Sequence, residues 1–155
     1  MASILASLLL IAAAQPASGP APANGDAAAV AAACGGEIYD ADIARMSKAA
    51  LAARLACFTR EAANGLNRQL PQRIDKATLL QRVSAEGTTL TYHYSVDLLS
   101  SELKPGALDA FKPNVIAKVC AATDMRRIIS IGGSYRYIWL DRNGVTLGDL
   151  VVSSC

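Results

Sequence analysis

The sequence has few of the side chains that carry enzyme chemistry. It contains one histidine, His93, and no G-x-S-x-G, H-E-x-x-H or phosphate-loop pattern. Among thirteen acidic residues, Asp40 and Asp42 are the close pair, and both suit the first turn of a helix. One histidine with four scattered cysteines also lacks zinc-site spacing. We therefore expect a protein that is not an enzyme and that has no metal and no cofactor.

The sequence also lacks a large net charge. The formal charge is +2, which is too small to indicate a nucleic-acid partner. The cations are unevenly placed, because residues 45–82 hold eight of them against Glu61 and Asp75, a local net charge of +6. A solvated face is the interpretation that we favour, with at most weak membrane-surface contact. Contact with a glycan or an acidic protein is left open.

No hydrophobic run is long enough to cross a bilayer. The apolar stretch within Met1–Ala14 has about eleven residues, whereas a spanning helix needs about twenty. It has the form of a secretory signal, with small-residue cleavage sites before Gln15 and Asn24. We predict a signal peptide at 1–23, a flexible Ala/Pro/Gly-rich spacer at 24–36 and one domain at 37–155. The mature protein would then be periplasmic or secreted.

Four cysteines allow three complete pairings. An exported protein meets an oxidising compartment, where disulfides form. We favour Cys120 with Cys155 and Cys34 with Cys57, because each pair links neighbouring segments of the chain. No C-x-x-C pattern indicates redox catalysis.

Helical spacing occurs in three segments. Apolar residues recur at helical intervals over 41–63, over 108–121 and over a short stretch that begins at Thr123. Pro113 fits best in a first helical turn, so we expect regular helix from about Phe111.

Period-two spacing predicts two hairpins. The first has strands at 78–84, where Leu79 and Val83 would share a face, and at 90–96. The second has strands at 135–140 and 145–153, joined by the turn Asp141-Arg142-Asn143-Gly144. The expected fold is α+β, a four-stranded antiparallel sheet from two hairpins with helices packed on one face.

Five of the eight aromatic residues alternate along two of these strands. Core is the interpretation that we favour, because two amphipathic helices need apolar surface to cover. An exposed binding platform is left open. The lone histidine is expected to be exposed, about 13 Å along its strand from Asp97. The candidate binding surface comprises Tyr92, His93, Tyr94, Tyr135, Arg136, Tyr137 and Trp139.

Several motifs together resemble a known group of proteins. They are Leu70-Pro71…Asp75, Leu90-Thr91-Tyr92-His93-Tyr94, Cys120…Met125, Tyr135-Arg136-Tyr137…Asp141…Gly144 and Cys155. Their spacing over 70–155 resembles small exported or membrane-tethered bacterial proteins of unknown function. The resemblance implies two hairpins that flank a helix and a pair between the late cysteines. It implies no active site, and Cys34 and Cys57 lie outside it.

These observations favour a non-catalytic interaction module whose partner is an unknown protein or envelope component. Two alternatives stay open. An inhibitor or immunity protein would need a protruding loop, for which Leu98–Gly106 is the candidate. A small periplasmic hydrolase would need a cleft that is lined by acids or by His93.

Overall fold

The computed structural model describes residues 24–155, with side chains from residue 28 onward. The predicted signal peptide at 1–23 therefore lies outside the described residues. Within the described part, no helix is both long enough and apolar enough to cross a membrane.

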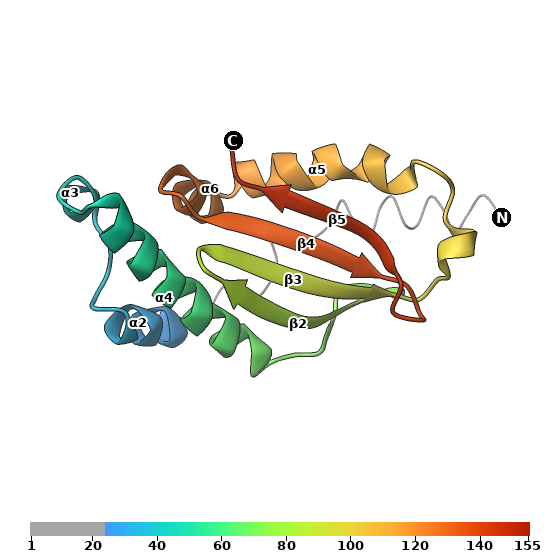
Figure 1. Cartoon of the computed structure of the whole chain (residues 1–155). Coiled ribbons are helices and arrows are strands. Elements are labelled where there is room, and N and C mark those ends of the chain that lie inside the picture. Colours follow the sequence, from blue (N-terminus) through green and yellow to red (C-terminus); the bar gives the residue numbers. More distant parts are fainter. Residues whose placement is uncertain (1–23) are drawn as a thin grey trace.

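One mixed sheet of five strands forms the centre of the fold (Figure 1). The strands lie in the order β1 (Gln72–Arg73), β2 (Thr78–Glu86), β3 (Thr89–Val96), β4 (Ser134–Leu140) and β5 (Thr146–Val152). Both predicted hairpins are present, but β3 and β4 pair in parallel. The expected four-stranded antiparallel sheet is therefore wrong in strand number and in this pairing. A parallel pair needs a long crossover connection, which residues 97–133 supply.

The helices lie in two groups. Before the sheet come α2 (Asn24–Ala33), α3 (Asp40–Ile43) and α4 (Lys48–Asn67). Between β3 and β4 come a short 3₁₀ helix (Ser100–Glu102), α5 (Ala107–Ala121) and α6 (Thr123–Ser130). Figure 1 shows α5 along the β5 side of the sheet and α4 on the β2 side. A helix thus lies near each of the two edges of the sheet.

The N-terminal segment differs from its prediction in two ways. The stretch expected as a flexible spacer contains α2, and Cys34 just after it is joined to Cys57 of α4. The Arg54 guanidinium also donates to the carbonyls of Gly35 and Gly36, at 2.7 and 2.9 Å. The expected single helix at 41–63 is two helices, because the Ser47 hydroxyl accepts the Ala50 N–H and starts α4 anew. These contacts order a segment whose composition indicates flexibility.

Helix α5 also differs from its prediction. It begins at Ala107, and Pro113 lies in its interior rather than in its first turn. Proline removes one hydrogen bond there, the one to the carbonyl four residues earlier. Phe111 and Val115 are buried on either side of it, so tertiary packing offsets that loss.

The register gives the sheet two different faces. One face holds the cross-strand rows Val83–Tyr92–Tyr137–Leu150 and Leu80–Tyr94–Trp139–Gly148, which pack against the helices. We call it the helix-covered face. The other holds the rows Ser84–Thr91–Arg136–Val151 and Arg82–His93–Ile138–Asp149. We call it the open face, because no helix crosses in front of these strands in Figure 1.

A bulge in β2 overturns one expectation about these faces. The register shifts between Leu80 and Arg82, so one additional residue enters β2. Leu80 and Val83 therefore face the core together, whereas Leu79 was expected to share a face with Val83. A bulge breaks strict alternation because two residues oppose one on the partner strand.

Side chains of α4 close the outer edge of β2. The Asn67 amide donates to the Val83 carbonyl at 2.7 Å and its oxygen accepts the Val83 N–H at 2.8 Å. The Thr59 hydroxyl donates to the Gly87 carbonyl at 2.8 Å. The unpaired backbone groups of an exposed strand edge can pair with another chain. These hydrogen bonds satisfy some of those groups.

The late cysteines tie the last strand to the helix layer. Cys120 in α5 is bonded to Cys155, three residues after β5 ends. Together with Cys34–Cys57, these are the two pairings that the sequence analysis favours. The described residues contain no free cysteine.

Replacing Gly133 by alanine should destabilise the protein. An added Cβ would lie 2.4 Å from Ile128 Cγ2 and 3.0 Å from the Ile128 carbonyl oxygen, so α6 and β4 would have to separate. We expect a loss of about 1 to 3 kcal/mol in the free energy of unfolding, the usual cost of overpacking. Urea titration of both proteins measures it.

Gly65→Ala is the matched control. Gly65 lies inside α4, and a Cβ there would meet only the Arg68 guanidinium, at an ordinary 3.6 Å. Alanine should therefore stabilise this helix by about 0.5 to 1 kcal/mol. Equal effects of the two substitutions would contradict the proposed contact between Gly133 and Ile128.

Candidate functional site

The sequence-predicted binding residues divide between the two faces of the sheet. Tyr92, Tyr94, Tyr135, Tyr137 and Trp139 lie on the helix-covered face, whereas His93 and Arg136 lie on the open face. Alternation along a strand separates neighbours in sequence, so the seven residues do not form one surface.

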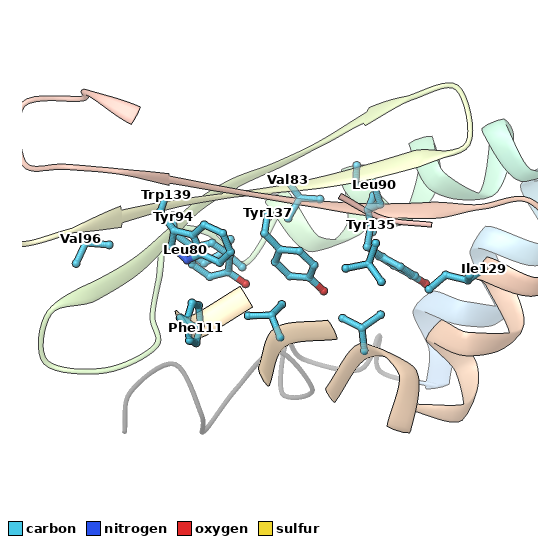
Figure 2. Packing of buried hydrophobic residues seen from close by; sticks show 14 of the residues in the cluster. Leu80, Val83, Leu90, Tyr94, Val96, Phe111, Ile129, Tyr135, Tyr137 and Trp139 are labelled. Carbon is cyan, nitrogen blue, oxygen red and sulfur yellow. The ribbon is translucent and has the colours of Figure 1, made fainter. Parts of the chain in front are cut away.

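The rings are part of the core. Tyr137 stacks on Tyr92 with ring centroids 5.4 Å apart and on Trp139 at 6.0 Å, and Phe111 of α5 meets Trp139 edge-on at 5.7 Å. Figure 2 shows Tyr135 and Tyr137 pointing from the sheet toward the helices. Burial raises the pKa of Tyr135 to about 12 and holds the pKa of Tyr92 and Tyr137 above the ordinary value. The aromatic side chains thus hold the layers together and do not form an exposed platform.

His93 lies at the centre of the open face and is buried, with 8% of its surface exposed. It was expected to be exposed, but its neighbours in the same rows cover it. Its Nε2 lies 2.8 Å from the Ser84 hydroxyl oxygen. Burial lowers the pKa of His93, and the nearby charges of Arg82 and Arg136 lower it further. Burial and both arginines thus favour the neutral form of the imidazole.

An ion pair borders this histidine. Arg136 Nε donates to the two carboxylate oxygens of Asp149 at 2.9 and 3.1 Å, and a second guanidinium nitrogen also donates to Asp149. These hydrogen bonds hold the pKa of Asp149 below its ordinary value. Both side chains stay 40% exposed, so the pair lies at a surface that a partner can reach.

The contact between Ser84 and His93 lacks one part of a hydrolytic triad. A nucleophile and base need a third group that stabilises the imidazolium. Asp149 is the carboxylate in the two cross-strand rows that contain Ser84 and His93, and it is bonded to Arg136. Two arginines also oppose protonation of His93. Among residues 24–155, no group of three or more metal-ligating side chains occurs.

A pocket of about 260 Å³ lies between the loop after β3, the start of α5 and β5. Its charged residues include Lys112 and Asp109, whose Nζ and Oδ1 are 2.8 Å apart, and Lys104. It contains none of the residues of the candidate binding surface. The acid in its lining, Asp109, is thus paired with Lys112.

The candidate for a protruding loop, Leu98–Gly106, is held against the body of the protein at several of its residues. Leu98 is buried, Leu103 packs on the core, and the Ser100 N–H donates to Asp141 at 3.1 Å. Asp141 also accepts the N–H groups of Asn143 and Val145, each at 2.8 Å. Leu98–Gly106 thus contacts the body through Leu98, Ser100 and Leu103, while Lys104, Pro105 and Gly106 are exposed.

Asp141 makes the stability of this corner depend on pH. Burial opposes its ionisation, but the hydrogen bonds from Val145, Ser100 and Asn143 outweigh burial and lower its pKa. A depressed folded-state pKa gives stability that is present above the unfolded value of about 3.9 and is lost as pH falls through the folded value. Asp141→Asn should therefore flatten the fall in unfolding free energy between about pH 5 and pH 2.

Urea titrations of both proteins at several pH values test this expectation. A fall with pH that is equally steep in the variant would show that Asp141 does not contribute to it.

Comparisons with known proteins give the fold. The sequence matches no family model and no curated protein sequence. Three solved structures are similar. A candidate secreted protein of Pseudomonas aeruginosa has a TM-score of 0.59 and 18% identity over 66% of this chain and 91% of its own. A pilotin of the Vibrio vulnificus type 2 secretion system has a TM-score of 0.58 and 17% identity over 67% and 92%.

The third is a type II secretion system pilotin of Vibrio cholerae, with a TM-score of 0.54 and 22% identity over 68% of this chain and 94% of its own. The fold is thus shared with a candidate secreted protein and with two secretion-system pilotins, and the two disulfides are consistent with an extracytoplasmic location.

Proposed function

We propose that this protein is a non-catalytic accessory protein of the bacterial envelope that acts by binding a component of a secretion assembly. The observation that carries the proposal is a fold shared with two pilotins of type II secretion systems over about two thirds of the chain. The site supports the proposal, because the acid near His93 is bonded to Arg136 and the acid that lines the pocket is bonded to Lys112. The predicted signal peptide and the disulfides favour the periplasm as the location.

We further propose that the open face is the surface that binds this component. Val151 is 52% exposed there, beside half-buried Ile138, so an apolar centre is available to a partner. The Arg136–Asp149 pair lies on the diagonal between these two residues and offers both signs of charge. Interfaces combine apolar and polar contacts, and this face offers side chains of both kinds. The aromatic residues of the original candidate surface would contribute by keeping the sheet rigid.

Photo-crosslinking in cells tests the proposal. A photoreactive residue replaces Val151 on the open face, and a second protein carries it at Ile116, which is 37% exposed on α5. Both are β-branched surface residues, so the pair is matched. We expect a discrete product from position 151 that mass spectrometry identifies as a component of a secretion assembly. Products from position 116 alone, or from neither position, would contradict the proposed surface.

A further inference from the structure

Five cations gather along one edge of the molecule. They come from the second half of α4, from β1, from the turn after it and from β2, which are neighbours in the fold. All are exposed. We call this set the basic edge, and it comprises Arg60, Arg68, Arg73, Lys76 and Arg82. With Glu61, Asp75 and Glu86 in the same elements, the local net charge is +2.

Acids neutralise only part of this edge. Arg60 is paired with Glu61, with Nε and Oε1 3.1 Å apart. Asp97 lies beside the edge, since its N–H donates to the Ala77 carbonyl at 2.7 Å, but its carboxylate accepts from Arg142 Nε at 2.8 Å. Among the described residues, Lys76 and Arg82 form no ion pair. Their charges are therefore available to an external anion.

The rest of the chain has the opposite sign. Outside residues 45–82 the sequence has seven basic and eleven acidic residues, a net charge of −4. The small total charge thus results from two parts of unlike sign. An anionic surface would attract the basic edge and repel the remainder, which would orient the molecule.

The edge has the wrong chemistry for an apolar interface. The exposed large hydrophobic residues of the described chain are Tyr39, Ile116, Val145 and Val151, and none belongs to the α4–β1–β2 segments that form it. A specific protein interface centres on buried anchors, whereas a headgroup layer needs only a high density of charge. Exposed cationic side chains suit the second kind of contact.

We propose that the basic edge holds the protein against the anionic headgroups of a phospholipid bilayer, by charge alone and without insertion. The contact leaves most of the open face accessible, since Arg82 is the member of the edge that also lies on that face. A partner and a membrane surface could therefore be engaged together. This inference does not depend on the identity of the partner.

Vesicle sedimentation tests the inference. We expect the protein without its signal peptide to bind vesicles with about 30% phosphatidylglycerol at low salt and to leave them at about 0.5 M salt, where the Debye length is only about 4 Å. It should not bind pure phosphatidylcholine. Arg73→Gln with Lys76→Gln should lower the partition roughly 25-fold, because each cation near such a surface contributes about fivefold.

The matched control is Lys104→Gln with Lys118→Gln, which removes the same charge from the loop before α5 and from α5 itself. It should bind as the unchanged protein does, and circular dichroism should show both variants folded. Equal losses from both variants, binding that resists high salt, or no binding would overturn the proposal. Retention on poly-glutamate instead of vesicles, dependent on Arg73 and Lys76, would assign the edge to an acidic protein and would also overturn it.

Discussion

Trp139→Ala should lower the free energy of unfolding by about 3 to 5 kcal/mol, the usual cost of removing a large buried ring. Trp139 is stacked on Tyr94 and Tyr137 within the sheet, at 6.2 and 6.0 Å, and receives the Phe111 edge from α5. Its removal would open a cavity between the sheet and α5. Equilibrium urea titrations that are followed by far-UV circular dichroism measure the change in the free energy of unfolding. This signal does not depend on the fluorescence of the removed tryptophan.

Ile138→Ala is the control, because Ile138 adjoins Trp139 in β4 but is half-buried on the open face. Ile138→Ala should lower the free energy of unfolding by less than half as much as Trp139→Ala, since less apolar surface returns to water. If the two substitutions cost the same, the division of the sheet into a helix-covered face and an open face is wrong.

Replacing Cys120 and Cys155 by serine should cost about 2 to 5 kcal/mol, the range for losing a native bridge in a small exported domain. The bridge closes a loop with a sequence separation of 35, and it anchors the end of the outermost strand β5. Without it, the last strand would fray from its end. Hydrogen exchange should therefore accelerate most at the amides of β5, with smaller changes in β2 and β3.

The other disulfide supplies the comparison. Cys34→Ser with Cys57→Ser should accelerate exchange in α2, which this bridge holds on α4, and leave β5 protected. Loosening of the same strand by both double variants would show that the bridges act on global stability and not on separate elements.

Much of the fold follows from local patterns in the sequence. Tyr135, Tyr137 and Trp139 alternate with residues of the other face, and the turn at Asp141–Gly144 returns the chain, so the second hairpin could be predicted. The parallel pairing of β3 with β4 could not, because alternation gives faces but not the relative direction of two hairpins. That direction depends on how α5 and α6 cross the sheet.

The candidate site was less predictable, because it depends on register. His93 is polar and lies on the polar side of β3, which indicates exposure, yet its cross-strand neighbours Arg82 and Ile138 bury it. The bulge near Gln81 placed Arg82 beside His93, and no local signal marks a bulge there. Likewise nothing in the sequence marks Asn67 as the residue that closes the edge of β2.

Complementation tests most directly the claim that this protein acts by binding through its open face and not by catalysis. In a strain that lacks the protein, the amount of substrate exported by the secretion system is measured after each variant is restored. We expect Ser84→Ala, which removes the hydroxyl beside His93, to restore export fully. Val151→Arg, which places a charge at the exposed apolar centre, should fold normally and fail to restore export. Unchanged export in the deletion strain, or failure of Ser84→Ala together with success of Val151→Arg, would contradict this account.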